Sequence, residues 1–180
     1  FRLLSRKFVT LSSDLKTCYQ QIKKYISVHK QIIIFGFTYE LFMLFKNLEG
    51  LNESTVESPN LFIIHGGGWK KLQNLRIDNQ SFQNLLRRRF PRSHILNYYG
   101  MIEQTGIIYP RCELGYYHFT DYSKIIIRGV DGVKLGQGKQ GIIQSISILP
   151  RSYPGHSILT QDVGMIHKES ICKCGRIGQI

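Results

Sequence analysis

The segment "NLFIIHGGGW" (residues 60–69) is a short apolar run that breaks into three consecutive glycines. An apolar run of this length, followed by glycine, is typical of a buried parallel strand. Next come "DNQSFQNLL" (78–86), which predicts a helix over 78–89 that is capped near Asp78, and "HILNYYG" (94–100), a further strand. Upstream, the pattern predicts a helix over 13–29, a strand at "QIIIFGF" (31–37) and a helix at 39–50. Strands that alternate with helices imply a parallel sheet flanked by helices.

The character of the chain changes after residue 107. The segments "YYHFTDYSKIIIRGV" (116–130) and "GIIQSISILP" (141–150) are rich in β-forming residues, and "VDGVKLGQGKQG" (130–141) supplies turns between them. We therefore expect an α/β fold: an α/β layer over 1–106, followed by a β-rich region over 107–180. Because the chain starts at Phe1 and stops at "GRIGQI", we expect one continuous domain that is truncated at both ends.

Composition limits the classes of partner. The 180 residues carry a net charge of +12, and no run has the apolar length of a membrane span. The arginine cluster at 85–92 falls where cations suit a helix C-terminus, and no recognised nucleic-acid-binding motif accompanies it. We therefore expect a cytoplasmic protein for which nucleic-acid binding is the minority interpretation.

Three loops leave the carboxyl ends of the predicted strands, where open α/β sheets bind ligands: 35–38, 65–71 and 97–106. Gly66, Gly67 and Gly68 could bring bare backbone amides against a planar or anionic ligand, although no GKS or GKT follows as in a phosphate-binding loop. In "NYYGMIEQTG" (97–106), a tyrosine offers a flat face, and Glu103 could hold a hard cation. The alternative is a half-buried tyrosine pair beside a surface glutamate.

A fourth candidate is "SYPGHSILTQDVG" (152–164). Thr160 and Asp162 lie two residues apart, on one face of the chain if it is extended. The aspartate could accept hydrogen bonds from both hydroxyls of a ribose. The alternative is an aspartate that only caps a turn.

The order "GGGWKK … YYGMIEQTG … CELGYYHF … LPRSYPGHSILTQDVG … CKCGRIGQ" resembles the acyl-protein synthetases of the LuxE type over about residues 30–180. These are fatty-acid-activating enzymes of the adenylate-forming superfamily, and the chain is also similar to the phenylacetate-CoA ligase branch. The resemblance implies that the glycine loop and the tyrosine loop frame the adenine of ATP, that Glu103 helps to hold Mg²⁺ and that Asp162 binds the ribose. The cofactor-binding residues implied or proposed in this way are Gly66, Gly67, Gly68, Tyr98, Tyr99, Gly100, Thr160 and Asp162.

The implied activity is ATP-dependent formation of a fatty acyl-adenylate with transfer to a protein cysteine, alongside a reductase partner. The alternatives are an acyl- or aryl-CoA ligase and a non-catalytic nucleotide- or nucleic-acid-binding fragment. The chain departs from the superfamily pattern at Ile102, where a threonine is usual, and at Gln161, where a glycine is usual. The phosphate loop and the lid with the catalytic lysine are not found in this sequence, so we expect the fragment alone to be inactive.

Four residues could form a metal site. Cys112 and His118 are separated from Cys172 and Cys174 by about sixty residues, and three thiolates with one imidazole would complete a tetrahedral structural zinc site. Cys18, on the first predicted helix, suits a small core residue. The rival to zinc follows from the resemblance: Cys172 or Cys174 could accept the activated acyl group. Inert thiols are the third alternative.

Overall fold

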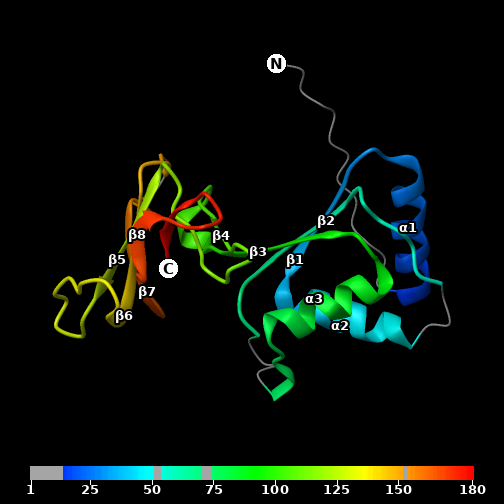
Figure 1. The fold of residues 1–180 in the computed structure, drawn as a ribbon, viewed down its shortest axis with the longest axis horizontal. Helices are drawn as coiled ribbons and strands as arrows, with labels where there is room; N and C mark the ends of the chain where they lie inside the picture. The colour runs from blue at the N-terminus through cyan, green and yellow to red at the C-terminus, as the bar shows by residue number, and fades with distance from the viewer. Residues whose placement is uncertain (1–13, 51–53, 70–73, 152–153) are drawn as a thin grey trace. The chain divides into compact units, whose positions relative to one another are not determined.

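The computed structural model describes residues 14–50, 54–69, 74–151 and 154–180 (Figure 1). Lys70 and Lys71 of the glycine-loop motif, and Ser152 and Tyr153 of the ribose motif, lie outside these ranges. The chain forms two compact units: Phe1–Ile63 with Trp69–Ile95, and Ile64–Gly68 with Leu96–Ile180. The boundary expected from the sequence, between an α/β layer over 1–106 and a β-rich region over 107–180, stays a prediction.

The alternation of helices and strands is present as expected. In chain order the elements are α1 (Leu15–Val28), β1 (Ile32–Phe37), α2 (Thr38–Glu49), β2 (Leu61–Gly66), α3 (Asn79–Arg89) and β3 (His94–Tyr99). Aspartate caps define two helix starts. The carboxylate of Asp14 accepts a hydrogen bond from the backbone N–H of Thr17, and that of Asp78 accepts one from Ser81. Each cap satisfies a backbone donor that the first helical turn leaves without a partner.

The first unit has its own apolar core. Each of its three helices turns one face inward and buries large side chains against the strands. The most deeply buried side chains of this core, from the helices, from β2 and from the end of α3, are Tyr19, Ile22, Phe45, Leu48, Leu61, Ile63, Phe82, Leu86 and Phe90. Such burial is the main favourable term in folding, so this core holds β1 and β2 in place.

The first sheet has the strand order β1-β2-β3-β4. The strands β1, β2 and β3 are joined by crossovers that contain α2 and α3, the connection typical of a parallel sheet. The short strand β4 (Tyr109–Pro110) pairs antiparallel with the end of β3, with Tyr99 opposite Tyr109. This pairing fixes the end of β3, from which the tyrosine loop begins.

The second unit is β-rich, as predicted. After the 3₁₀ helix η2 (Ile102–Gln104), the strands β5 (Ser123–Arg128), β6 (Gln140–Ser147) and β7 (Ser157–Met165) form an antiparallel sheet in the order β5-β6-β7. A hairpin of β8 (Lys168–Ile171) and β9 (Ile177–Gln179) follows. The core of the second unit consists of Ile107, Tyr109, Ile125, Ile127, Ile143 and Ile166.

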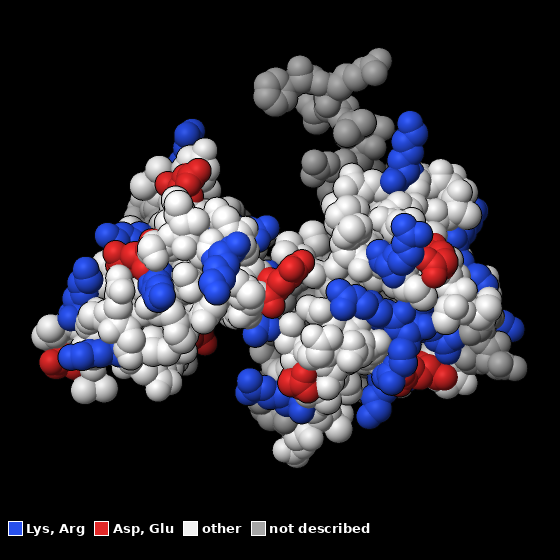
Figure 2. Space-filling view, in the orientation of Figure 1, with Lys and Arg blue, Asp and Glu red and all other residues white. Residues whose placement is uncertain are grey.

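Charge is distributed over both units. On the face drawn in Figure 2, Lys and Arg side chains lie among Asp and Glu side chains. Among the described residues, no helix combines the length and the apolar character that crossing a membrane requires.

Candidate nucleotide site and cysteine–histidine cluster

The glycine loop and the tyrosine loop meet at Gly66 and Tyr98. A Cβ added to Gly66 would lie 2.7 Å from the Cζ atom of Tyr98, closer than real Cβ contacts allow. Gly66 is therefore the residue that lets the Tyr98 ring lie against the backbone at the end of β2. Gly67 has a φ of 77°, in the left-handed region that favours glycine, whereas a Cβ on Gly68 would meet no described atom within 4 Å.

Tyr99 reaches the candidate ribose aspartate. Its hydroxyl donates a hydrogen bond of 2.7 Å to Oδ2 of Asp162, a residue 63 positions further along the chain. Burial, together with the hydrogen bond and the negative charge of Asp162, raises the pKa of Tyr99 above its usual range. The phenol therefore stays protonated near neutral pH and keeps donating to the carboxylate.

Strand β7 presents Asp162 in an extended segment, as the sequence indicated. Asp162 is exposed, so its carboxylate is accessible to a ligand. The hydroxyl of Thr160 donates to the backbone carbonyl of Ile143 at 2.9 Å and accepts from the backbone N–H of Asp162 at 3.1 Å. Thr160 therefore supports the backbone beside Asp162, and its role in binding the cofactor stays a prediction.

Glu103 and Gln104 are neighbours with opposite environments. Both lie on η2, where the Glu103 side chain is exposed and Gln104 is only 1% exposed. An exposed carboxylate at this position has the chemistry of a ligand for a hard cation. Gly100, two residues after Tyr98, is packed against the Tyr98 ring and the carbonyl of Ile107, where a Cβ would lie 3.3 Å from each.

The Gln104 amide links three segments of the second unit. Its nitrogen donates to the backbone carbonyl of Gly155 at 2.9 Å and to that of Ser145 at 3.3 Å. Its oxygen accepts from the Ser145 hydroxyl, which also bonds to the Tyr109 hydroxyl at 2.7 Å. The buried network ties the helix that carries Glu103 to β6 and to the turn before β7.

A second polar network joins the end of β2 to β3 and to the segment after β4. The Asn97 side chain bonds to Nδ1 of His65 at 3.1 Å and accepts from the Tyr117 hydroxyl at 2.7 Å. Burial, with a smaller contribution from the positive charge of Arg111, lowers the pKa of His65 to about 4. The imidazole is therefore neutral at pH 7, as its buried position next to the glycine loop requires.

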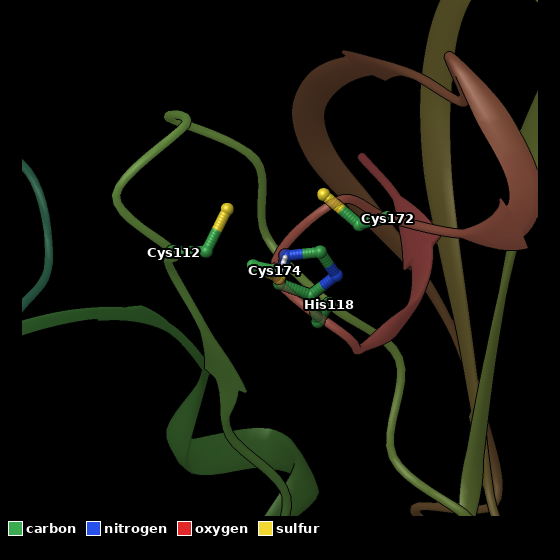
Figure 3. A group of neighbouring side chains, drawn as sticks. All are labelled: Cys112, His118, Cys172 and Cys174. Atoms are coloured by element: carbon green, nitrogen blue, oxygen red, sulfur yellow. Dashed lines mark hydrogen bonds between the residues drawn. The ribbon is translucent and has the colours of Figure 1, made fainter.

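The four predicted metal-site residues converge. Cys112, His118, Cys172 and Cys174 each place a ligand atom in one cluster, in which all these atoms lie within 4.8 Å of one another. Figure 3 shows the side chains pointing into a common space from two separate stretches of chain. The convergence fits the zinc alternative, and the roles of Cys172 and Cys174 as zinc ligands or acyl acceptors stay predictions.

Several supporting residues were not anticipated from the sequence. Gln104 and Ser145 form buried hydrogen bonds next to the candidate site, and Asn97 and Tyr117 form a partly buried one. The loop carries no sequence signal for this role, because Gln104 is only one of several polar residues in it. Its partners lie 41 and 51 residues away, so no local pattern predicts them.

Comparison with solved structures defines the class of fold as that of adenylate-forming ligases. The chain is similar to a 2-hydroxyisobutyryl-CoA ligase in complex with 2-HIB-AMP and CoA, with a TM-score of 0.67 and 12% identity, over 96% of this chain and 36% of that one. It is also similar to a long-chain-fatty-acid-CoA ligase from Archaeoglobus fulgidus, with a TM-score of 0.56 and 16% identity, over 92% and 33%. A third similar structure is ATP-bound MatB from Rhodopseudomonas palustris, with a TM-score of 0.55 and 13% identity, over 89% and 32%.

Comparison with protein families then identifies the family. Residues 9–180 match the family described as "Acyl-protein synthetase, LuxE", and the chain belongs to that family. No curated protein matches it by sequence. The chain spans about a third of the length of the three similar structures, which makes it a fragment relative to them.

Proposed function

We propose that the protein containing this chain activates a fatty acid with ATP, as an acyl-adenylate, and transfers the acyl group to a protein cysteine. The family supports the reaction class. The long-chain-fatty-acid-CoA ligase among the similar structures supports a fatty acid as the substrate. A reductase that consumes the acyl group is the proposed partner, and the cytoplasm, which supplies ATP, is the proposed location.

The observation that carries the proposal is the hydrogen bond between Tyr99 and Asp162. It joins the tyrosine loop to β7, two segments proposed from the sequence to bind the adenine and the ribose of one nucleotide. A flat aromatic side chain and an exposed carboxylate at hydrogen-bonding distance have the chemistry that a nucleoside requires. The backbone at Gly66, over which the Tyr98 ring lies, borders the same loop.

Each residue has a proposed task in the first step. In that step a carboxylate oxygen of the fatty acid attacks the α-phosphorus of ATP, the bond to the β-phosphate breaks, and pyrophosphate leaves. Asp162 would accept from the ribose hydroxyls, and the tyrosine loop would hold the base. Glu103 would hold Mg²⁺, which offsets negative charge on the phosphate oxygens. The exposed position of Glu103 on η2 fits this task, because a metal ligand must reach the bound nucleotide.

The second step transfers the acyl group to a thiol. The thiolate attacks the acyl carbonyl carbon, the bond to the phosphate oxygen breaks, and AMP leaves. Thiolate sulfur is the appropriate nucleophile, because it attacks activated acyl groups readily near neutral pH. A protein cysteine and CoA are chemically equivalent acceptors here, so the acceptor must be decided by experiment.

The test uses the full-length protein with ATP, Mg²⁺ and radiolabelled tetradecanoate, in the absence of CoA. We expect pyrophosphate release and label on the protein that hydroxylamine removes, because a thioester is labile to it. If the protein carried no covalent label, and labelled acyl-CoA formed once CoA was added, the protein would instead be a CoA ligase. Nucleotide binding without pyrophosphate release would contradict the enzymatic proposal.

Asp162→Asn tests the residue that carries the argument. We expect it to weaken ATP binding in calorimetry, because a carboxamide accepts hydrogen bonds less strongly than a carboxylate. Asp121→Asn is the matched control, since Asp121 is an exposed aspartate of the same unit, in the turn before β5. Equal ATP affinity in the two variants would remove Asp162 from the nucleotide site.

A further inference from the structure

Two turns of the second unit share one backbone geometry. In the turn Cys112–Gly115, the N–H of Gly115 donates to the carbonyl of Cys112, whose own N–H donates to residue 116. In the turn Cys172–Gly175, the N–H of Gly175 donates to Cys172, and the N–H of Cys172 donates to residue 176. The two glycines have φ angles of 91° and 86°, which favour glycine.

These turns present their cysteines to one point. The first turn contributes the sulfur of Cys112 and the second contributes those of Cys172 and Cys174, and all ligand atoms of the cluster lie within 4.8 Å of one another. In a tetrahedral site with Zn–S bonds near 2.3 Å, the ligand atoms are about 3.5 to 4 Å apart. The observed cluster therefore needs only a small contraction to reach zinc geometry.

The orientation of His118 supplies an independent observation. Its ring is fully buried, and Nδ1 lies 2.5 Å from the carbonyl oxygen of Gly178. Because a carbonyl only accepts, Nδ1 carries the proton and donates it. With Nδ1 as the donor, Nε2 is the ring nitrogen left to offer a lone pair to a metal in the cluster, and it lies 3.4 Å from the Cys174 sulfur (Figure 3). A ring nitrogen held by a backbone carbonyl is the usual support of a metal-binding histidine.

We propose that Cys112, His118, Cys172 and Cys174 bind one zinc ion. Four protein ligands leave no coordination position for water or substrate, so the site is structural rather than catalytic. Three thiols lose their protons when the metal binds, and the bound thiolates more than balance the two positive charges of the ion. The zinc would fasten the turn that follows β4 to the turn between β8 and β9.

The zinc site does not depend on the proposed activity, but it restricts the acyl acceptor. The chain has four cysteines, and the zinc would occupy three of them. The fourth, Cys18, is 1% exposed in the core of the other unit. The acceptor of an acyl-protein synthetase reaction would therefore be a cysteine outside these four.

Metal analysis of the purified full-length protein is the first test. We expect one zinc per chain assigned to this cluster, retained in Cys18→Ala and lost in Cys174→Ser. Cys18→Ala is the matched control, because it removes a buried cysteine that takes no part in the cluster. Replacement of zinc by cobalt should give the visible absorption of a tetrahedral thiolate site in the parent protein and in Cys18→Ala.

A conservative pair separates metal binding from general damage to the fold. We expect His118→Cys to keep one zinc, because four cysteines also form a structural tetrahedral site, whereas His118→Ala should lose it. A second measurement needs no variant: a strong chelator should expose three additional thiols to a thiol reagent. A folded parent protein without zinc after growth in zinc-replete medium would overturn the proposal. A disulfide within the cluster, or an acyl group on Cys172 or Cys174, would also overturn it.

Discussion

The second unit contains two long-range side-chain assemblies with opposite relations to solvent. The Tyr99–Asp162 pair joins residues 63 positions apart and leaves the Asp162 carboxylate exposed on β7. The cysteine–histidine cluster joins residues about as far apart, but it buries His118 and Cys172. The nucleotide candidate thus offers polar groups outward, while the cluster turns its donors toward one another.

This difference indicates what each assembly is for. An exposed carboxylate costs the fold little and can exchange water for a ligand, whereas buried sulfur and nitrogen ligands that face one another suit an ion that stays bound. We therefore expect exposed residues of the nucleotide candidate to affect activity without affecting stability. Buried residues around the loops and in the cluster should affect stability first.

The largest expected effect is that of Glu103→Gln in the full-length protein. Loss of the charged ligand for Mg²⁺ should raise the barrier to adenylation by about 2 to 4 kcal/mol, the range for removal of one electrostatic stabiliser. Because Glu103 is exposed, the free energy of unfolding should change by less than about 0.5 kcal/mol. Pyrophosphate release measures the first quantity, and urea unfolding measures the second.

Glu169→Gln is the control for that variant, since Glu169 is an exposed glutamate on β8 of the same unit. It should leave both quantities unchanged. If Glu103→Gln lowered stability and left adenylation intact, the expectation that exposed residues of the nucleotide site affect activity rather than stability would be wrong for Glu103.

The second prediction concerns pH and the buried His65. Its pKa in the folded protein is about 4, against 6.5 for an ordinary histidine, so between these values the unfolded chain binds a proton that the folded chain does not. Stability should therefore be fully present above pH 6.5 and decline as the pH falls toward 4. At about 1.4 kcal/mol per pKa unit, the contribution of His65 amounts to about 3 kcal/mol.

The variant His65→Asn isolates this contribution, because asparagine does not titrate in that range. Urea unfolding at a series of pH values should show a shallower decline below pH 6.5 in His65→Asn than in the parent. Parallel curves for the two proteins would mean that His65 is not held neutral in the folded state.

The third and smallest predicted effect is a difference in stability between alanine substitutions at two glycines of one loop, Gly66 and Gly68. Gly66→Ala should lower the free energy of unfolding by about 1 to 3 kcal/mol, because the added Cβ would press on the Tyr98 ring. Gly68→Ala, whose Cβ would meet no described atom within 4 Å, should leave stability unchanged. Thermal unfolding of both variants checks this, and equal destabilisation would contradict the packing of Tyr98 on Gly66.

Much of the fold was predictable because its signals are local. Asp14 and Asp78 sit where the caps are needed, and the apolar runs at β1 and β2 end at glycine or close to it. The convergence of the cysteines and His118 was also predictable in outline, because three cysteines and one histidine are a common ligand set for structural zinc. The matched turns around the cluster were not, because they depend on backbone hydrogen bonds that the spacing alone does not specify.

The support of the candidate site was harder to predict for a physical reason. The role of Thr160 in binding the cofactor beside Asp162 stays a prediction, whereas the bond of its hydroxyl to the backbone carbonyl of Ile143 was not anticipated. A hydroxyl in a strand has such backbone partners close at hand in the folded sheet, and the sequence does not show which strand will supply them. The same holds for Gln104, whose partners come from β6 and from the turn at Gly155.

Through Gln104, the position of the proposed magnesium ligand Glu103 also depends on a turn that is distant in the sequence. One amide nitrogen bonds to Gly155, just before β7, and the residue preceding this amide is Glu103. A displacement of the Gly155 turn must therefore either break a buried hydrogen bond or drag η2 with it. The 3₁₀ helix that carries the proposed metal ligand and the strand that carries the proposed ribose ligand are therefore coupled through one buried hydrogen bond, and a shift of the turn that keeps this bond also moves η2.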